Sequence, residues 1–290
     1  MIKNLTEGKP LKLLFFFSLP MLMGNLFQQL YNMVDSIVVG NFVGADALAA
    51  VGASFPVVFL AVALASGLSM GCNVVISQLF GAGRIREMKT TISTALIGQF
   101  VLSIGITIVG EIISPGILRM LKTPDNIMAD SLIYLRIYLG GAVFLFIYNT
   151  LNGIYNALGD SKTPVYFLAM SSVLNIGLDL AFILVFRLGV AGASLATVLS
   201  QGVSGLACLV YMVKQFPILH MSREERQLDI RSCRALCFMG VPMGLQYSIT
   251  AIGSIFLQSA VNSLGSLYVA GVAAGSKLFQ LLGCLSLLLH

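Results

Sequence analysis

Residues 18–52 have the sequence SLPMLMGNLFQQLYNMVDSIVVGNFVGADALAAVG, in which two apolar segments are joined by a short turn. A helix needs about 20 mainly apolar residues to cross a bilayer, and the first segment, residues 13–39, is long enough. Asn25, Gln28, Asn32 and Asp35 interrupt it at intervals of 3, 4 and 3 residues, which places them on one helical face. The stretch predicts a membrane-spanning helix whose polar face borders a wet cavity or a polar partner helix.

The composition of the whole chain indicates the same class. Of 290 residues, 57% are hydrophobic and 10% are charged, whereas soluble domains contain roughly 25% charged residues. This inventory cannot cover a water-soluble surface, so the lipid bilayer is the expected surrounding. The net charge is +5, but the basic residues flank apolar segments and form no basic face, which argues against nucleic acid as a partner.

The apolar segments predict an all-α, polytopic membrane helix bundle. Eight segments reach the length of a span, and Gly, Pro and polar residues separate them. The predicted spans are residues 13–39, 47–76, 92–115, 131–155, 165–186, 190–213, 235–260 and 267–289.

The basic residues predict the orientation, because cytoplasmic loops are enriched in Lys and Arg. With the N-terminus inside, twelve of the 17 basic residues lie on the cytoplasmic side. They are Lys3, Lys9, Lys12, Arg84, Arg86, Lys89, Lys162, Lys214, Arg223, Arg226, Arg231 and Arg234. We therefore expect a multi-pass protein of the cell (inner) membrane with a cytoplasmic N-terminus.

An internal repeat suggests two lobes. The stretch from residue 18 resembles GVPMGLQYSITAIGSIFLQSAVNSLGSLYVAGVAA at 240–274, with Pro20 matching Pro242 and Gly44 matching Gly265. The offset brackets six spans, so both copies face the same way, as in transporters built from parallel repeats. We predict a six-helix N-terminal lobe at 1–213, a cytoplasmic linker at 214–234 and the start of a C-terminal lobe at 235–290. The second copy stops inside its second helix, which favours a protein nearer twelve spans over a natural eight-helix protein.

Two intramembrane carboxylates are the candidate coupling groups. Ionisable residues inside a membrane are costly and are functional by default. Asp179 has Asn175 on the same helical face, and the next span carries Thr197 and Gln201. With Asp35, these oxygen atoms suit a small cation such as Na⁺. The same poorly solvated carboxylates could instead carry a proton, and a purely structural role as packing hydrogen-bonders is the alternative.

Other residues have predicted roles in movement and substrate contact. Pro20 removes a backbone hydrogen bond and is either a hinge or a static bend. Lys277 lies mid-span and is expected to line the cavity of the second half. The seventh span has a polar seam without a carboxylate, which places ion coupling in the first half. The predicted substrate-cavity residues are Asn25, Gln28, Tyr31, Asn32, Gln201, Gln246 and Lys277.

Several stretches resemble the multidrug and toxic compound extrusion (MATE) transporters. They are the SLP of the first span, VDSIVVGNFVGADALAAVG at 34–52, SQLFGAG at 77–83, NALGDSKTP at 156–164, NIGLDLAFILVFRLGVAGASLATVLSQ at 175–201 and the segment from GVPMG at 240. The resemblance implies two six-helix lobes that export organic cations and other amphipathic compounds in exchange for Na⁺ or H⁺, by a protein that functions as a monomer when full length. By similarity, the coupling residues map to Asp35, Asn175, Asp179 and Thr197, and the bending proline maps to Pro20.

Rival functions make different demands on the sequence. A lipid-linked oligosaccharide flippase of the same wider architecture needs several cationic residues inside the first lobe, and the spans there contain Arg136. An intramembrane enzyme needs a nucleophile and a base, but no His lies in a predicted span. A passive channel would not move substrate uphill. We therefore expect an antiporter with no enzymatic activity, and no cofactor other than the transported Na⁺ or H⁺.

Overall fold

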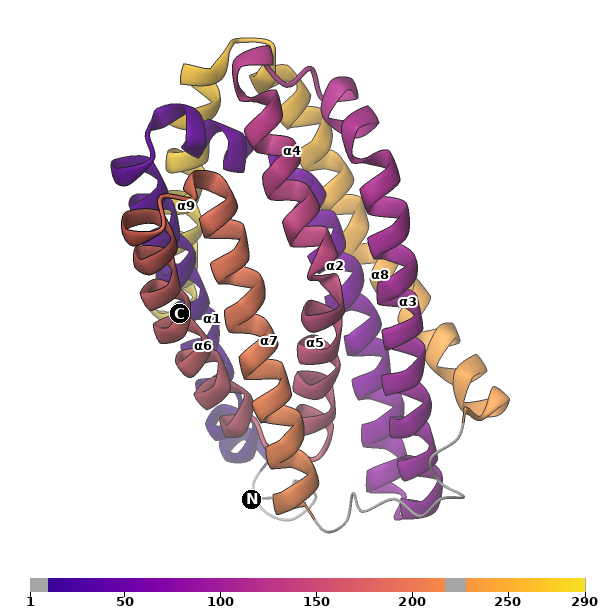
Figure 1. Ribbon diagram of the computed structural model, residues 1–290. Helices are drawn as coiled ribbons and strands as arrows, with labels where there is room; N and C mark the ends of the chain where they lie inside the picture. Colours follow the sequence, from indigo (N-terminus) through magenta and orange to yellow (C-terminus); the bar gives the residue numbers. More distant parts are fainter. Residues whose placement is uncertain (1–9, 217–227, 290) are drawn as a thin grey trace.

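The computed structural model describes residues 10–216 and 228–289, and in this part of the chain all regular secondary structure is helical (Figure 1). The predicted all-α helix bundle is thereby confirmed. The elements are α1 (Pro10–Phe42), α2 (Ala45–Gly81), α3 (Ile85–Met120), α4 (Asp125–Gly140), α5 (Ala142–Ala157), α6 (Lys162–Leu180), the π-helical turn η1 (Ala181–Val185), α7 (Gly189–Gln215), α8 (Ile230–Asn262) and α9 (Ser266–Leu289).

Most of these helices have the dimensions of membrane spans. By length and composition, five qualify among the described residues: α2, α3, α6 with η1, α7 and α8; the bent pair α4 and α5 makes a sixth if it is one span. The helices α1 and α9 cover the first and last predicted spans. Large apolar side chains face outward, and Ile112 and Val173 are each 73% exposed. An apolar flank of this kind suits contact with lipid chains.

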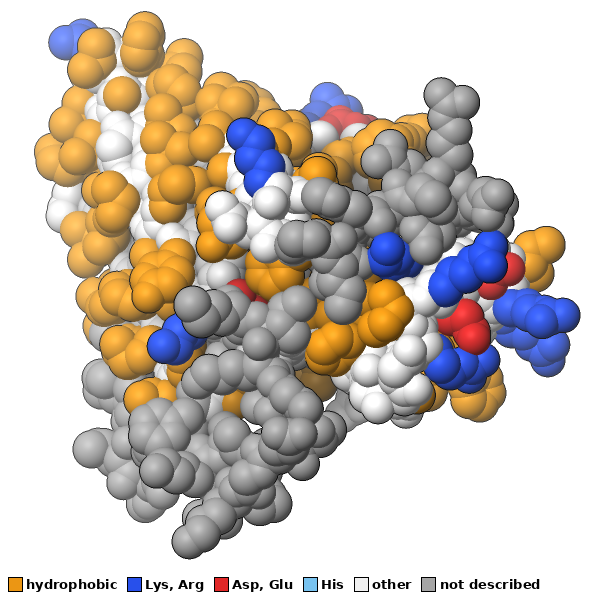
Figure 2. All heavy atoms as spheres, turned by 90° about the horizontal axis from the view of Figure 1, so that it is seen from below, with side chains coloured by type: hydrophobic (Ala, Val, Ile, Leu, Met, Phe, Trp, Pro, Cys, Tyr) orange, Lys and Arg blue, Asp and Glu red, His pale blue; other side chains and the backbone are white. Residues whose placement is uncertain are grey.

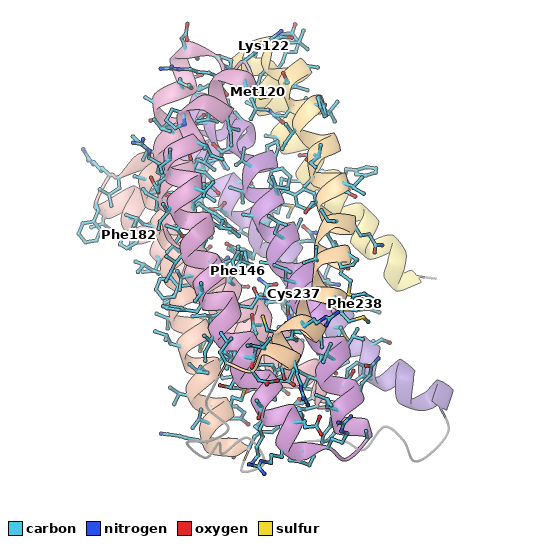
Figure 3. All side chains as sticks on the ribbon, turned by 90° about the vertical axis from the view of Figure 1, so that its right-hand side faces the viewer. Met120, Lys122, Phe146, Phe182, Cys237 and Phe238 are labelled. Carbon is cyan, nitrogen blue, oxygen red and sulfur yellow. The ribbon has the colours of Figure 1, made fainter. Side chains whose placement is uncertain are left out.

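The charged and apolar side chains occupy different parts of the surface. Viewed from below, Lys, Arg, Asp and Glu side chains gather toward one region, whereas hydrophobic side chains cover a broad flank (Figure 2). The side view shows buried and exposed apolar side chains (Figure 3). Phe146 lies among the helices and is 1% exposed, whereas Phe238 projects from α8 and is 78% exposed.

The predicted single span at 131–155 is wrong in one respect, because the helix breaks at Gly141 and the two parts are bent by 49°. A Cβ atom at Gly141 would collide with the side chain of Val198 on α7. The missing side chain lets α7 approach the break closely. The fifth predicted span is also irregular, since α6 ends at Leu180 and continues as η1.

Helix α2 is central and contacts both ends of the chain. It packs against α1, α3, α4, α5 and α7, and also against α8 and α9. Gly67 and Gly71 of α2 face Gly240 and Gly244 of α8, and a Cβ built on Gly67 would lie 2.5 Å from the Cα of Gly244. Each pair has the GxxxG spacing that lets membrane helices meet backbone to backbone. We call these four residues the glycine contact.

Both copies of the internal repeat have a glycine of positive φ at the turn. Gly44 lies between α1 and α2 with φ of 122°, and Gly265 lies between α8 and α9 with φ of 100°. Both angles are in the left-handed region that glycine adopts without steric cost. The two glycines paired by the repeat thus share this backbone feature.

Part of the predicted linker and orientation signal cannot be compared with the structure. Lys3, Lys9, Arg223 and Arg226 lie outside the described residues, so the cytoplasmic N-terminus stays a prediction. Both ends of the predicted linker at 214–234 are helical, because α7 continues to Gln215 and α8 begins at Ile230.

Helix α8 starts at a defined cap. The Asp229 carboxylate accepts a hydrogen bond from the backbone N–H of Ser232 at 2.7 Å. This bond satisfies one of the unpaired N–H groups of the first turn, and it also lowers the pKa of the Asp229 carboxyl below its ordinary value.

Candidate functional site

The two predicted carboxylates meet between α1 and α6. Asp179 is fully buried in the last turn of α6, directly before η1, and Asp35 lies on α1, which packs along α6. Tyr31, one helical turn before Asp35, donates a hydrogen bond to Thr197, and Asn175 connects Thr197 to Asp179. In both Asp35 and Asp179 the Oδ1 atom is buried without a hydrogen-bond partner. Buried charges need a partner of opposite sign, so this pair has the chemistry to take up a proton or a small cation.

Asn175 and Thr197 complete the predicted cluster. With its nitrogen toward Asp179, the Asn175 amide donates to Oδ2 of that carboxyl at 2.8 Å, and its oxygen accepts from the backbone N–H of Thr197 at 3.3 Å. The Thr197 hydroxyl donates to the carbonyl of Ala193 at 3.1 Å. The structure therefore brings together the four residues proposed for cation coupling, from α1, α6 and α7.

The donor set fits a monovalent cation better than a transition metal. Within the described residues, no group of three or more His, Cys, Asp or Glu side chains is placed to hold a metal. The predicted Na⁺ ligands are instead two carboxylates with an amide and a hydroxyl, all hard oxygen donors of the kind that bind alkali and alkaline-earth ions. The role of these residues as Na⁺ or proton ligands stays a prediction.

Three tyrosines surround the carboxylates. The hydroxyl of Tyr31 donates to Oγ1 of Thr197 at 3.4 Å. Tyr134 and Tyr138 of α4 stack with ring centroids 6.2 Å apart. Sequence reasoning missed both α4 tyrosines; their spacing of four residues was the available signal, since it places two hydroxyls on one helical face.

The remaining substrate-cavity candidates lie apart from the cluster. Asn25, Gln28 and Gln246 are exposed, and Asn32 is half-buried on α1. In the described residues, no hydrogen bond joins these four side chains to the carboxylates. Pro20 lies inside α1, which is helical on both sides of it. Their predicted roles in substrate contact and hinge movement stay predictions.

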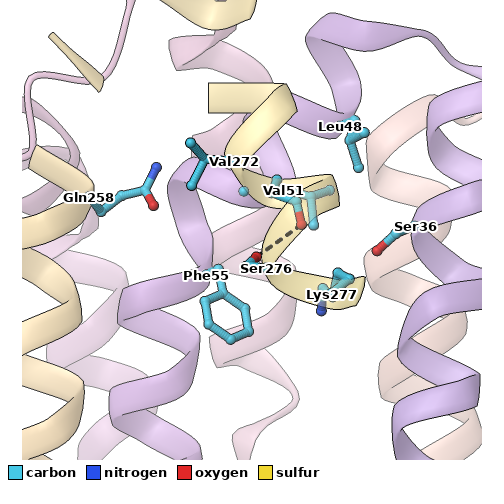
Figure 4. A pocket seen from close by; sticks show the side chains of 10 residues that line it. Ser36, Leu48, Val51, Phe55, Gln258, Val272, Ser276 and Lys277 are labelled. Carbon is cyan, nitrogen blue, oxygen red and sulfur yellow. Dashed lines mark hydrogen bonds between the residues drawn. The ribbon is translucent and has the colours of Figure 1, made fainter. Parts of the chain in front are cut away.

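Lys277 lies at a seam between distant parts of the chain. Its Nζ is 5.0 Å from the ring centroid of Phe55 on α2. With Ser36, Gln258 and Ser276 it lines a cavity of about 40 Å³ between α1, α2, α8 and α9 (Figure 4). The cavity predicted for the second half alone is thus bounded by helices of both halves.

Several apolar helices of span length define a multi-pass α-helical membrane protein. The chain belongs to the MatE family, whose model matches residues 20–181. This confirms the family resemblance that the sequence motifs predicted.

Relatives of known name agree with this assignment. The chain is 37% identical to "Probable multidrug resistance protein YpnP" of Bacillus subtilis (strain 168), covering 95% of this chain and 61% of that protein. It is 32% identical to "Probable multidrug resistance protein YoeA" of the same organism, covering 86% of this chain and 56% of that protein. The chain thus spans about three fifths of the length of these relatives.

Solved MATE structures show the same fold. An inward-facing conformation of a multidrug resistance MATE family transporter matches with a TM-score of 0.80 and 29% identity over 86% of this chain and 57% of that one. An outward-facing conformation matches with a TM-score of 0.81 and 27% identity over 96% of this chain and 65% of that one.

Proposed function

We propose that this chain works in a cation-coupled antiporter that exports lipophilic organic cations by alternating access. The observation that carries the proposal is the cluster of buried Asp179, Asn175 and Thr197 with the half-buried Asp35 of α1. The relatives named as multidrug resistance proteins support drug transport, and the inward-facing and outward-facing structures support alternating access.

In the proposed coupling, the cation and the drug favour different states of the protein. A Na⁺ ion or a proton that binds the carboxylate pair neutralises part of its charge and draws α1 toward α6. Coupling requires only that the cation and the drug favour different states of the protein, and a difference of about 1–3 kcal/mol is typical of coupled sites. We expect the protein to act in the cell membrane as a monomer.

Vesicle transport tests the proposal. Uptake of ethidium into inside-out vesicles is compared for the wild type, Asp35→Asn and Asp179→Asn, with Na⁺ and pH gradients imposed separately. We expect both variants to lose gradient-driven uptake at least about tenfold at normal membrane levels. The gradient that drives the wild type identifies the coupling ion.

Asp125→Asn is the matched control, because Asp125 is an exposed residue in the first turn of α4. It should transport like the wild type. Full gradient-driven uptake by both Asp35→Asn and Asp179→Asn would refute coupling by the carboxylate pair.

The flippase alternative needs several cationic residues inside the first lobe, and Arg136 is the one that the predicted spans there contain. The Nε atom of Arg136 lies 3.5 Å from a carboxylate oxygen of Glu111, and both side chains are over a third exposed. Because Arg136 already has an acidic partner, the first lobe does not present it as a free group for a lipid phosphate.

A further inference from the structure

The end of α8 is joined to the first half of the chain by a buried hydrogen bond. Asn262, the last residue of α8, is 2% exposed, and its Nδ2 atom donates to the carbonyl of Leu121 at 2.8 Å. Leu121 lies in the turn between α3 and α4. One turn earlier in α8, the Gln258 amide donates to Oδ1 of Asn262 at 2.8 Å. Both polar atoms of the Asn262 amide are therefore engaged, and they fix the end of α8 against that turn.

A second set of hydrogen bonds ties α9 to the same end of the bundle. The Asn126 amide, in the first turn of α4, donates to Oδ1 of Asp46 at 3.2 Å and to Oγ of Ser266 at 3.0 Å. Asp46 lies in the first turn of α2, and Ser266 is the first residue of α9. The turns that precede α2, α4 and α9 thus lie together at one end of the bundle (Figure 1). We call the hydrogen bonds of Asn262 and Asn126 the end latch.

A small apolar cluster lies next to the end latch, one turn further along α2 and α9. Its buried members come from α2, α4 and α9, and they are Ala49, Ala50, Ala53, Ile127, Val269 and Ala270. Each of them is at most 7% exposed. Small side chains let helices approach closely in a membrane, so this cluster closes the bundle between its two halves directly beneath the hydrogen bonds.

The glycine contact holds α8 on α2 at a distance from the end latch. Gly244 precedes Asn262 by about five helical turns. At the glycine contact, backbones touch and no polar group is available to exchange partners with water. At the end latch, amide and carbonyl groups join the halves, and water can replace each of these partners. The end of α8 can therefore separate from the α3–α4 turn while the glycine contact stays closed.

We propose that the end latch is the gate between the two halves of the transporter at this end of the bundle. The proposal rests on the alternating access of the proposed function and is independent of the coupling ion. When the substrate path opens toward this end, the α8–α9 turn leaves the α3–α4 turn, and the latch groups bond to water. When the path closes, the bonds form again over the apolar cluster. In the predicted orientation, this end faces the outside of the cell.

Distance measurements across the end latch test the proposal. Spin labels are placed at Met120, the last residue of α3, and at Leu267 in the first turn of α9; both side chains are 76% exposed. The native cysteines are first replaced, and the protein is studied in lipid nanodiscs without drug or gradient. Asn262→Leu removes both amide bonds and should raise the population with the longer distance about tenfold. Ser266→Ala removes one solvent-exposed bond and should give a smaller rise in the same direction.

A neighbouring residue and a second label pair provide the controls. Ser263 follows Asn262 and donates to the carbonyl of Ala260 in its own helix, so Ser263→Ala should keep the wild-type distances. Labels at Ala82 and Ile230, both exposed, report on the opposite end of α8, and their distance should not lengthen in Asn262→Leu. An unchanged distance across the latch in both latch variants would overturn the proposal. Lengthening of both label pairs would also overturn it, because that is a general loosening of α8.

Thiol accessibility gives an independent measure of opening. Val269, in the apolar cluster, is 0% exposed. In the cysteine-free protein, Val269→Cys is treated with a membrane-impermeant maleimide in nanodiscs, which expose both faces of the membrane. Adding Asn262→Leu should raise the rate of labelling about tenfold, and adding Ser263→Ala should leave it unchanged. Equal rates in the two backgrounds would overturn the gate.

These readouts separate the gate from the antiport proposal. Asp35 and Asp179 are unchanged in every latch variant, and the distances and labelling rates are measured without transport. Opening in the latch variants supports the gate even if the carboxylate variants keep ethidium uptake. Loss of uptake in the carboxylate variants, with no opening in the latch variants, supports antiport and overturns the gate.

Discussion

Two of the places where α8 and α9 meet the rest of the bundle differ in character. At the glycine contact, α8 and α2 touch through the backbones of Gly67, Gly71, Gly240 and Gly244, and no side chain separates them. Beside α9, by contrast, lies a cavity of about 40 Å³ that Lys277 lines together with Ser36 of α1 and Phe55 of α2.

The difference between these contacts predicts different mechanical roles. Backbone packed on backbone has one tolerated geometry, because an interior at crystal-like density cannot absorb an extra atom without shifting its neighbours. Residues that border a water-sized space can shift into it, so a contact of this kind tolerates more displacement. We therefore expect changes at the glycine contact to affect stability most, and changes around the carboxylates and the cavity to affect ion binding and movement most.

The largest effect should follow from Gly71→Ala. The new methyl group would overlap the backbone of Gly240, which cannot rotate away as a side chain could. Overpacking of this kind costs about 3 kcal/mol, so the free energy of unfolding should fall by that amount. Thermal unfolding in detergent and the amount of folded protein in the membrane are the measurements.

Gly98→Ala is the matched control, since a Cβ atom there meets nothing within 4 Å. It should leave the unfolding temperature unchanged or slightly higher. Equal stability of Gly71→Ala and Gly98→Ala would mean that α2 and α8 separate easily, and the contrast between the two contacts would be lost.

Asn175→Leu should have the next largest effect and should act on both stability and function. It removes the amide that donates to Oδ2 of Asp179 at 2.8 Å. A buried acceptor left without its donor costs about 2 kcal/mol, and ion-driven ethidium uptake should fall as well. Asn156→Leu, which removes an amide hydrogen bond to Asn152, should keep full uptake; equal loss in both variants would contradict a special role for Asn175.

Gly52→Ala probes the α2 and α9 contact beside the cavity, with a smaller expected effect. A Cβ atom at Gly52 would lie 2.7 Å from the Cβ of Ala273. We expect a loss of about 1 kcal/mol, because α9 can shift toward the adjacent space. Ala273→Gly should restore the unfolding temperature in the double variant. A failure of this rescue would show that the strain lies elsewhere than between these two residues.

The features that could be predicted from the sequence are those that depend on residues close together in the chain. Apolar segments of span length located the helices, because only a helix satisfies its own backbone in lipid. The glycines at 44 and 265 marked two turns where φ is positive. The cluster of Asp35, Asn175 and Asp179 was found because polar side chains are conspicuous in an apolar span.

The features that sequence reasoning missed depend on distant residues. At the break, Gly141 lies against Val198 on α7, and a glycine inside an apolar segment gives no sign of that approach. Tyr134 and Tyr138 are ordinary residues for a membrane span until α1 and α6 bring the carboxylates near them. Likewise, the position of Lys277 beside Ser36 and Phe55 follows from packing of α9 on α1 and α2.

Tyr31→Phe should produce the smallest effect, and it tests a residue of the carboxylate cluster against the glycine contact. The Tyr31 hydroxyl donates to Oγ1 of Thr197 at 3.4 Å, a long hydrogen bond. Its loss should cost about 0.5 kcal/mol and change the ion concentration for half-maximal uptake about twofold, with the unfolding temperature nearly unchanged. Ion dependence of ethidium uptake is the measurement, and Tyr247→Phe, at an exposed position on α8, is the control. A fall in stability as large as that of Gly71→Ala would place Tyr31 among the packing residues and not beside a cation site.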